Sequence, residues 1–323
     1  MTDVLILGGT GWLSRRIAQR WVDRGAAVVC LARGSREAPD GARLVVGDRD
    51  DPEAYGEVAR HEWDEVVDVS SHPGHVEDAV QALGARAGHW TYVSSFSAYA
   101  ANDVVGADET AALAEPAVDR DPSDYSRAKS AGEGFVRALG DRAAILRPGL
   151  IVGPGDPTDR FGYWPARFAL AADQPVLVPE GASLHAQVID VDDLADFAVE
   201  SALRRWHGAV NTIGPSRSLA DMLAIARAAA GHTGPVVSAP SDWLVEHGVA
   251  HWAGPRSLPL WLPDDMPGFA TRSGEAYLAS GGRVRSLDET LERVLADERD
   301  RGLDRSRRAG PTRAEELDLI GQR

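Results

Sequence analysis

The sequence predicts an α/β fold with a doubly wound parallel sheet. Short apolar runs rich in β-branched residues, each bounded by turn residues, alternate with longer segments of helix length. This alternation predicts βαβ units, whose crossover helices cover both faces of a parallel sheet. The helical segments 12–25 and 73–88 both end in glycine, a frequent helix terminator. The six predicted strands are 3–9, 26–32, 43–48, 65–71, 90–95 and 143–152.

The alternation stops after about residue 153. Residues 153–168 are rich in Pro, Gly and Trp, and a helix over 191–203 and a strand over 209–215 then resume the earlier pattern. These shifts predict two parts that are each built from two stretches of chain. The sheet domain is predicted to comprise 1–153 and about 186–214, and the smaller lobe about 154–185 and 215–323.

Acidic residues outnumber basic ones in this chain. There are 49 Asp and Glu against 34 Lys and Arg, which gives a formal net charge of −15. Nucleic acids and anionic membranes require a basic face, so we expect neither as a main partner. The charged segment 296–319 is predicted to be a solvated helix followed by a partly ordered end.

The single cysteine, Cys30, lies within an apolar run and is predicted to be buried. A lone cysteine forms no internal disulfide, and the start MTDVLILGG has no basic region and only a short apolar run. Both features predict a cytoplasmic protein. His72, His75 and His185 lack the spacing of metal ligands, so no metal site is predicted.

A glycine-rich turn follows the first predicted strand. Gly8 suits the tight turn and Gly11 permits close approach of a phosphate, just where a helix opens with Trp12 and Leu13. Free N–H groups at a helix start bind pyrophosphate, so the turn predicts a dinucleotide site. Ser14 takes the third glycine position and is small enough for close helix packing.

The residues after the second strand bear on which dinucleotide is bound. A site that prefers NAD places Asp or Glu there, whereas this chain has Arg33, Ser35 and Arg36. Guanidinium groups suit a 2′-phosphate, so NADPH is favoured over NADH. The alternative is that both arginines are solvated loop charges. Asp48, after the third strand, is placed to contact adenine, or else simply forms a turn.

Lys129 is the only lysine in the chain, and Tyr125 lies four residues before it. If Asp121 caps the helix and Pro122 opens it, both side chains lie on one helix face. An ammonium lowers the pKa of a neighbouring phenol and can donate to ribose hydroxyls. The pair therefore predicts a proton-transfer site. The alternative is that the two residues are merely neighbours on an exposed helix.

Serines lie at and just after the end of the fifth predicted strand, at the sheet edge that borders the ligand crevice. A hydroxyl there can bind a substrate oxygen while Tyr125 handles the proton. Ser94, Ser95 and Ser97 compete for this role, and serines at strand ends also cap the backbone.

These motifs together resemble the short-chain dehydrogenase/reductase superfamily, in its extended, epimerase/dehydratase-like branch. The resemblance covers the chain to about residue 215 and is loose beyond it. It implies a Rossmann-type fold with catalytic Ser95, Tyr125 and Lys129, and it places Arg147 and Pro148 beside the nicotinamide. Dehydratases follow the catalytic Thr with Asp-Glu, whereas Phe96 and Ser97 stand here, which argues against dehydration. The matching motifs are GGTGWLS, VSSFSAY, YSRAK with Glu133, LRPGLIVGPGD and HAQVIDVDDLADF.

The resemblance implies an NADPH-dependent oxidoreductase that reduces a ketone or aldehyde of a small metabolite, in secondary metabolism. It is compatible with a homodimer. The alternatives are a nucleotide-sugar epimerase with tightly held NAD and a non-catalytic dinucleotide-sensing regulator. The predicted cofactor-binding residues are Gly8, Gly11, Trp12, Leu13, Arg33, Arg36, Asp48, Ser70, Lys129 and Pro148. The predicted substrate-binding residues are Ser97, Arg160, Tyr163, Trp164 and Gln187.

Overall fold

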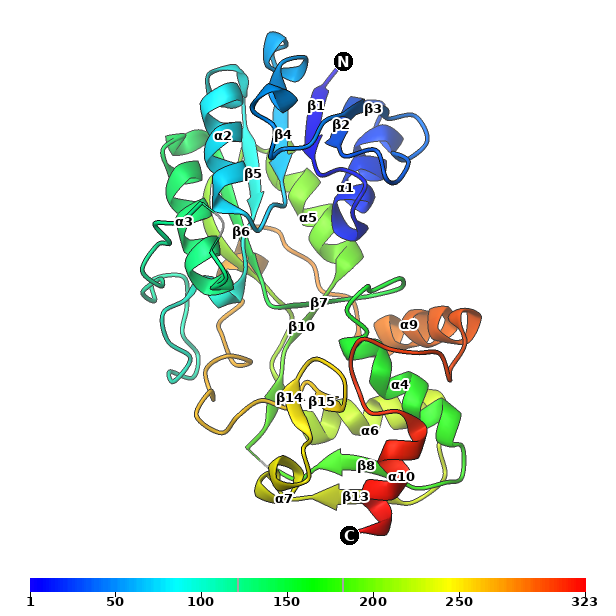
Figure 1. Cartoon of the computed structure of the whole chain (residues 1–323). Helices are drawn as coiled ribbons and strands as arrows, with labels where there is room; N and C mark the ends of the chain where they lie inside the picture. The colour runs from blue at the N-terminus through cyan, green and yellow to red at the C-terminus, as the bar shows by residue number, and fades with distance from the viewer. Residues whose placement is uncertain (121, 182) are drawn as a thin grey trace.

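A seven-stranded sheet forms the centre of the larger half of the molecule in the computed structural model, which describes residues 1–120, 122–181 and 183–323 (Figure 1). All neighbouring strands pair in parallel, in the order β11-β6-β5-β4-β1-β2-β3. This arrangement confirms the predicted doubly wound sheet. The strands are β1 (Asp3–Leu7), β2 (Ala27–Ala32), β3 (Arg43–Val46), β4 (Glu65–Asp68), β5 (Trp90–Val93), β6 (Ala143–Pro148) and β11 (Gly208–Thr212).

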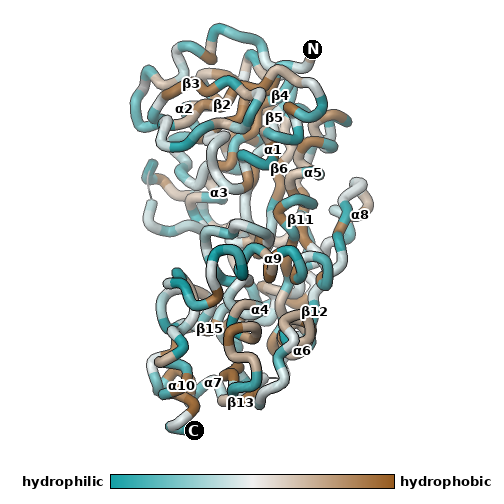
Figure 2. The backbone as a smooth tube through the Cα atoms, turned by 90° about the vertical axis from the view of Figure 1, so that its right-hand side faces the viewer, coloured by the Kyte–Doolittle hydropathy of each residue, from teal (hydrophilic) through white to brown (hydrophobic). Residues whose placement is uncertain are grey.

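Helices cover both faces of this sheet. Helices α1 (Trp12–Asp23) and α5 (Val191–Leu203) pack together on one face, and α2 (Pro73–Leu83) and α3 (Tyr125–Arg137) on the other (Figure 1). Alternate residues of β1 therefore enter different apolar cores: Val4 and Ile6 join the first, and Leu5 and Leu7 the second. Figure 2 shows the consequence, since the strands are largely apolar along their length.

A further apolar core fills the other half of the molecule, where the C-terminus lies (Figure 1). It draws on residues 150–186 and 219–319, while the predicted boundaries of the smaller lobe stay a prediction. The helices here are α4 (Arg160–Ala171), α6 (Leu219–Ala230), α7 (Ser241–Glu246), α9 (Leu287–Arg301) and α10 (Arg313–Gly321); α8 (Glu275–Ala279) packs on β11. Short strand pairs complete it: β7 (Leu150–Val152) with β10 (Val188–Asp190), β8 (Val176–Pro179) with β13 (Val236–Ala239), β9 (His185–Ala186) with β12 (Arg217–Ser218), and β14 (Ala250–Trp252) with β15 (Ser257–Pro259).

The predicted strand 143–152 is interrupted at Gly149. Strand β6 stays in the central sheet, whereas β7 leaves it and pairs with β10. A Cβ at Gly149 would lie 2.4 Å from Cδ1 of Ile213, so a larger residue where the chain turns away would displace that side chain. The sequence pattern could not show this break because both halves are equally apolar.

The prediction of a solvated, partly ordered C-terminal segment is wrong. Helix α9 packs against α4 and α6, and α10 packs against β8. Two of its carboxylates, Glu298 and Glu316, are buried, and arginines neutralise both of them. The high content of charged residues predicted an exposed segment. Because arginines pair with its buried carboxylates, the segment is both charged and packed against the rest of the protein.

The helices in the described part of the chain include none that is long and apolar enough to cross a membrane.

Gly9 is fixed by contact with the neighbouring strand. A Cβ at this position would lie 2.4 Å from Sγ of the buried Cys30 on β2. We expect Gly9→Ala to lower the free energy of unfolding by about 1–3 kcal/mol, because overpacking displaces the turn from β2. Urea denaturation measures this change.

Gly134 provides the matched control. It is exposed in α3, and a Cβ there would meet nothing within 4 Å. Gly134→Ala should therefore raise the free energy of unfolding by about 0.5–1 kcal/mol. Equal effects of both alanines would contradict the packing argument.

Candidate active site

A cleft runs along the edge of the central sheet where β1, β2 and β4 end. Its main cavity has a volume of about 680 Å³, and a neighbouring cavity of about 690 Å³ adjoins the start of α1. Carboxyl ends of parallel strands are where ligands bind in open α/β sheets. Six of the predicted cofactor residues line the main cavity: Gly8, Gly11, Arg33, Arg36, Asp48 and Ser70. Trp12 lines the neighbouring one, whereas Leu13, Lys129 and Pro148 line neither.

The glycine turn is held by Ser14 at the predicted third-glycine position. Gly8 has φ = +78°, which confirms that its conformation favours glycine. The buried Ser14 hydroxyl accepts from the Gly11 N–H at 3.1 Å and donates to the Gly8 carbonyl at 2.5 Å. Ser14 thus braces the turn as well as permitting close packing.

An ion pair that was not predicted from the sequence lies at the base of the cleft. Arg49 forms a two-point contact with the fully buried Asp68, with N–O distances of 3.0 and 2.8 Å. The Asp68 carboxylate also accepts from the Ser70 N–H at 2.8 Å, which orients the loop after β4. His75, also in the cavity wall, bonds Asp50 at 2.7 Å. No local motif marks these partners, because they come from separate strand ends.

Helix α3 begins three residues later than predicted. Asp124 is its N-cap, since its carboxylate accepts from the N–H groups of Ser126 and Arg127 at 2.9 and 3.2 Å. Tyr125 is therefore the first helical residue, and Pro122 precedes the helix. The predicted cap Asp121 lies outside the described residues.

The Lys129 ammonium is buried beneath the cleft and held by carbonyls. Its Nζ donates to the Ser70 and Val93 carbonyls, both at 2.7 Å, and lies 4.9 Å from the centre of the Tyr92 ring. It lies 5.9 Å from the centre of the Tyr125 ring, so the two residues share a helix face as predicted. Since an ammonium has three donors, one is not used by any described residue and is available to a ligand.

The structure distinguishes the three competing serines by their partners. Ser94 is buried and donates a hydrogen bond of 2.6 Å to Glu133. Arg147 donates two hydrogen bonds, of 2.8 and 2.7 Å, to the same carboxylate. Burial raises the pKa of Glu133, but Arg147 and Ser94 outweigh it, so the net pKa is lowered and the carboxylate stays charged. Ser94 is therefore engaged in the core.

Ser95 is the serine that faces Tyr125. Its hydroxyl accepts from the Ser97 N–H at 3.1 Å and interacts with the Tyr125 hydroxyl. The Tyr125 side chain remains accessible, with 47% of the residue exposed. Together with Lys129, these groups form one cluster beside the nucleotide cleft.

The pKa of Tyr125 is raised in this structure. Desolvation of the phenol by the surrounding protein raises its pKa most, while hydrogen bonds with Ser95 and Ser71 and the charge of Arg160 lower the pKa. The direction is opposite to the one predicted from the Tyr–Lys spacing. The reason is geometric, because the Lys129 ammonium bonds two backbone carbonyls instead of the phenol.

Comparison with known proteins decides the family. A model described as the NAD dependent epimerase/dehydratase family matches residues 4–213 of the chain. The chain belongs to this family. Its family model covers the central sheet, the glycine turn and the Ser95–Tyr125–Lys129 cluster.

Individual relatives of this NAD-dependent epimerase/dehydratase family member are distant. Ceramide reductase of Caulobacter vibrioides (strain NA1000 / CB15N) is 31% identical over 199 residues, which cover 59% of this chain and 58% of that protein, less than two thirds of its length. UDP-glucose 4-epimerase of Thermotoga maritima, solved with UDP-glucose, has a TM-score of 0.69 at 15% identity, over 93% of this chain and 99% of that one. UDP-glucose 4-epimerase of Thermus thermophilus, solved with NAD, has a TM-score of 0.64 at 18% identity, over 92% and 99%. At these identities the structural likeness concerns the fold.

The predicted substrate residues of this family member fall into two groups. Tyr163 and Trp164 are both 1% exposed within the apolar core of the smaller half, and Trp164 Nε1 donates to the Pro259 carbonyl at 2.8 Å. Their placement does not support contact with a substrate, because no face of either ring is free. The strong aromatic signal in 153–168 comes from core packing.

Arg160, Gln187 and Ser97 lie nearer the cluster. The Arg160 guanidinium stacks 5.0 Å from the Trp252 ring centre and acts electrostatically on Tyr125. Gln187 lines a small cavity with Phe96 and Trp252, but its amide is bonded to the backbone of Gly214 and Arg272. Arg160 is thus the predicted substrate residue best placed beside the phenol. The described residues include no group of three or more His, Cys, Asp or Glu that could hold a metal ion.

Burial lowers the pKa of Lys129 to about 8, against the attraction of Asp68 and Glu133. We expect NADPH affinity to fall as the pH rises through this value, because the ammonium becomes a neutral amine. The free energy of unfolding should not fall with it. A lysine whose folded pKa lies below its unfolded pKa of 10.5 makes folding more favourable as the pH rises between the two. Fluorescence titrations with NADPH at a series of pH values measure the affinity. The Lys129→Met variant should not show this fall in affinity, because it has no ammonium to lose its charge.

Proposed function

We propose that the protein is an NADPH-dependent oxidoreductase that reduces the ketone or aldehyde carbonyl of a small metabolite. The observation that carries the proposal is the cluster of Ser95, Tyr125 and Lys129 beside a nucleotide-sized cleft. An accessible phenol, a hydroxyl beside it and a buried ammonium below it are the groups that a carbonyl reduction requires. A sensor of dinucleotides would need the glycine turn but not this cluster.

The cleft fits a dinucleotide. Gly8 and Gly11 leave the backbone open for a pyrophosphate at the start of α1, and Lys129 has one free donor for a ribose hydroxyl. When bound, the reduced nicotinamide supplies a hydride. Arg33 and Arg36 line the cleft after β2, and neither forms an ion pair with any described residue, so both are available for a 2′-phosphate.

Tyr125 is the proposed acid. Because its pKa is raised, the phenol stays protonated at neutral pH and can donate its proton to the substrate oxygen as negative charge develops there. Ser95 donates a second hydrogen bond to that oxygen and holds the carbonyl in line with the phenol. Lys129 holds the cofactor ribose with the donor that the Ser70 and Val93 carbonyls leave unused.

Similarity to ceramide reductase favours reduction, although the match covers little more than half of that protein. The runner-up is a nucleotide-sugar epimerase with tightly held NAD, which the family model and the similarity to UDP-glucose 4-epimerases favour. An NAD site places an acid after the second strand to bind the ribose. Ala32 and Arg33 occupy that place here, which is why we prefer NADPH.

Cofactor binding tests the proposed preference. Wild-type protein should bind NADPH more tightly than NADH, and the double change Arg33→Ser with Arg36→Ser should weaken NADPH binding roughly tenfold or more, with little effect on NADH. Arg299→Ser, on an exposed arginine of α9, is the matched control and should change neither value. Tighter binding of NADH to the wild type would overturn the preference. Tight co-purification of NAD with conversion of sugar nucleotides would support the epimerase instead.

A further inference from the structure

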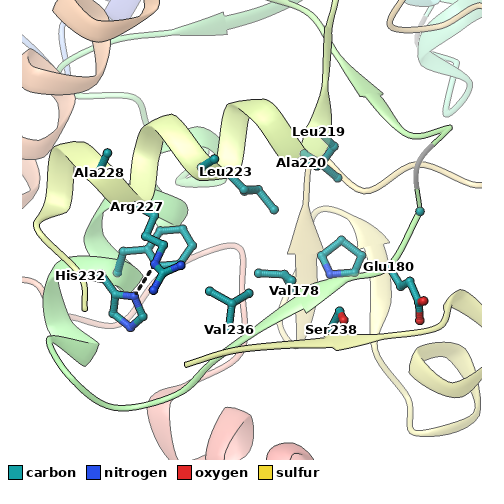
Figure 3. Close-up of a pocket in the computed structure, with 14 residues that line it drawn as sticks. Val178, Glu180, Leu219, Ala220, Leu223, Arg227, Ala228, His232, Val236 and Ser238 are labelled. Carbon is teal, nitrogen blue, oxygen red and sulfur yellow. Dashed lines mark hydrogen bonds between the residues drawn. The ribbon is translucent and has the colours of Figure 1, made fainter. Parts of the chain in front are cut away.

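Another large cavity is lined by a different part of the chain from the Ser95–Tyr125–Lys129 cluster. It has a volume of about 670 Å³ and lies between α6 and the strand pair β8–β13 (Figure 3). None of its lining residues lines the nucleotide cleft or belongs to the Ser95–Tyr125–Lys129 cluster. Its volume is typical of sites for small ligands. We refer to it as the α6 groove.

The walls of the α6 groove are apolar. One face of α6 contributes Leu219, Ala220, Leu223 and Ala228, and the strands opposite contribute Val178 and Val236 (Figure 3). Ala224 and Pro179 also line the groove. Ala220 and Ala224 are exposed, and Val236 is 40% exposed. A hydrocarbon chain laid between these walls would remove apolar surface from water, which favours binding. The groove is therefore suited to an apolar ligand body.

The guanidinium of Arg227 lies at one end of the α6 groove and is held in place by hydrogen bonds. The Nε of Arg227 donates to Nδ1 of His232 at 3.2 Å, and Nη2 donates to the Gly234 carbonyl at 2.8 Å. Because Nδ1 accepts, Nε2 of the buried His232 carries the proton and donates to the Gln174 carbonyl at 2.9 Å, so this histidine is neutral. The guanidinium is thus oriented by neutral groups only.

Arg227 keeps its full charge for a ligand. It forms no ion pair with any residue in the described part of the chain, and its Nη1 bonds no described group. The acid that lines the groove, Glu180, lies at the opposite end (Figure 3). The groove is polarised, with one positive end, an apolar middle and a negative far end.

We propose that the α6 groove binds a medium-chain fatty carboxylate, with its hydrocarbon along α6 and its carboxylate on Arg227. One guanidinium matches one carboxylate, which argues for a singly charged head and against a diphosphate. Between Leu219 and Arg227 the helix rises about 12 Å, which favours a medium chain over a long one. Glu180 enforces the direction, since it repels the head from the far end. This site is independent of the proposed reduction.

Calorimetric titration with decanoate, below its micelle concentration, tests the proposal on the full-length protein. Wild type should bind one decanoate, and decanol, which has the same chain without the charge, should bind roughly tenfold more weakly or not at all. Arg227→Gln should weaken decanoate binding by a similar factor. Ala224→Trp should abolish it, because the indole fills the middle of the groove.

Two variants on α9 control for charge and bulk. Arg299→Gln and Ala296→Trp also alter exposed helical residues, but outside the groove, and both should bind decanoate like wild type. Equal affinity for decanol and decanoate, or binding that survives Ala224→Trp, would overturn the proposal. So would an absence of decanoate binding together with a dimer that Ala224→Trp dissociates, because the groove would then be an interface between two copies of the chain.

Discussion

Tyr125→Phe is expected to lower kcat for carbonyl reduction by roughly 10²–10⁴-fold, the usual contribution of a positioned acid. The Kd for NADPH should stay close to the wild-type value, because the phenol is proposed to contact the substrate oxygen and lines neither cavity of the nucleotide cleft. The ring itself is retained, so the fold should not change. Steady-state kinetics together with NADPH titration separates the two effects.

Tyr163→Phe is the matched control for this substitution. The Tyr163 hydroxyl is buried without a partner in the described structure, so its removal should leave kcat unchanged and should not destabilise the protein. If Tyr125→Phe retained wild-type kcat, the proposed acid would be wrong. If Tyr163→Phe also lost activity, the loss in Tyr125→Phe could not be assigned to proton transfer.

Lys129→Arg is the second change with a large expected effect. The ammonium fits between two carbonyls at 2.7 Å and the Tyr92 ring, in a site that is 2% exposed. A guanidinium is larger and planar, so it should displace the loop after β4 and cost about 1–3 kcal/mol of stability by overpacking. We expect the Kd for NADPH to rise roughly tenfold or more, and kcat to fall with it.

Lys129→Met distinguishes loss of charge from loss of fit. Methionine fills a similar volume without a charge, so this variant should remain folded and still bind NADPH weakly. Thermal unfolding and NADPH titration of both variants give the comparison. Near-normal kinetics of Lys129→Arg would show that no ammonium is needed, and the single lysine would then be an accident of composition.

Much of the fold could be predicted because local signals agreed with it. Apolar runs of strand length predicted the parallel sheet, and the glycine turn predicted the helix α1, which begins at Trp12. The features that were missed depend on distant partners. Gly149, between β6 and β7, packs closely against Ile213, which comes from a much later segment of the chain.

The candidate site shows the same division. Tyr125 and Lys129 lie on one helix face, as their spacing predicted, but spacing did not reveal that backbone carbonyls bind the ammonium. Nor could it separate Ser94 from Ser95, since the choice depends on the buried Glu133. Tyr163 and Trp164 were predicted to bind the substrate. They are core residues instead, because the smaller half of the molecule has an apolar core of its own.

Isotope labelling distinguishes carbonyl reduction from epimerisation. The protein is incubated with NADPH that carries deuterium at both C4 positions of the nicotinamide and with a panel of ketones, aldehydes and sugar nucleotides, and the products are analysed by mass spectrometry. We expect one deuterium on the carbinol carbon of an alcohol for each NADP formed, and we expect Tyr125→Phe to stop this transfer. Conversion of one sugar nucleotide into its isomer, with no net consumption of NADPH and no deuterium in an alcohol, would contradict the proposed reduction.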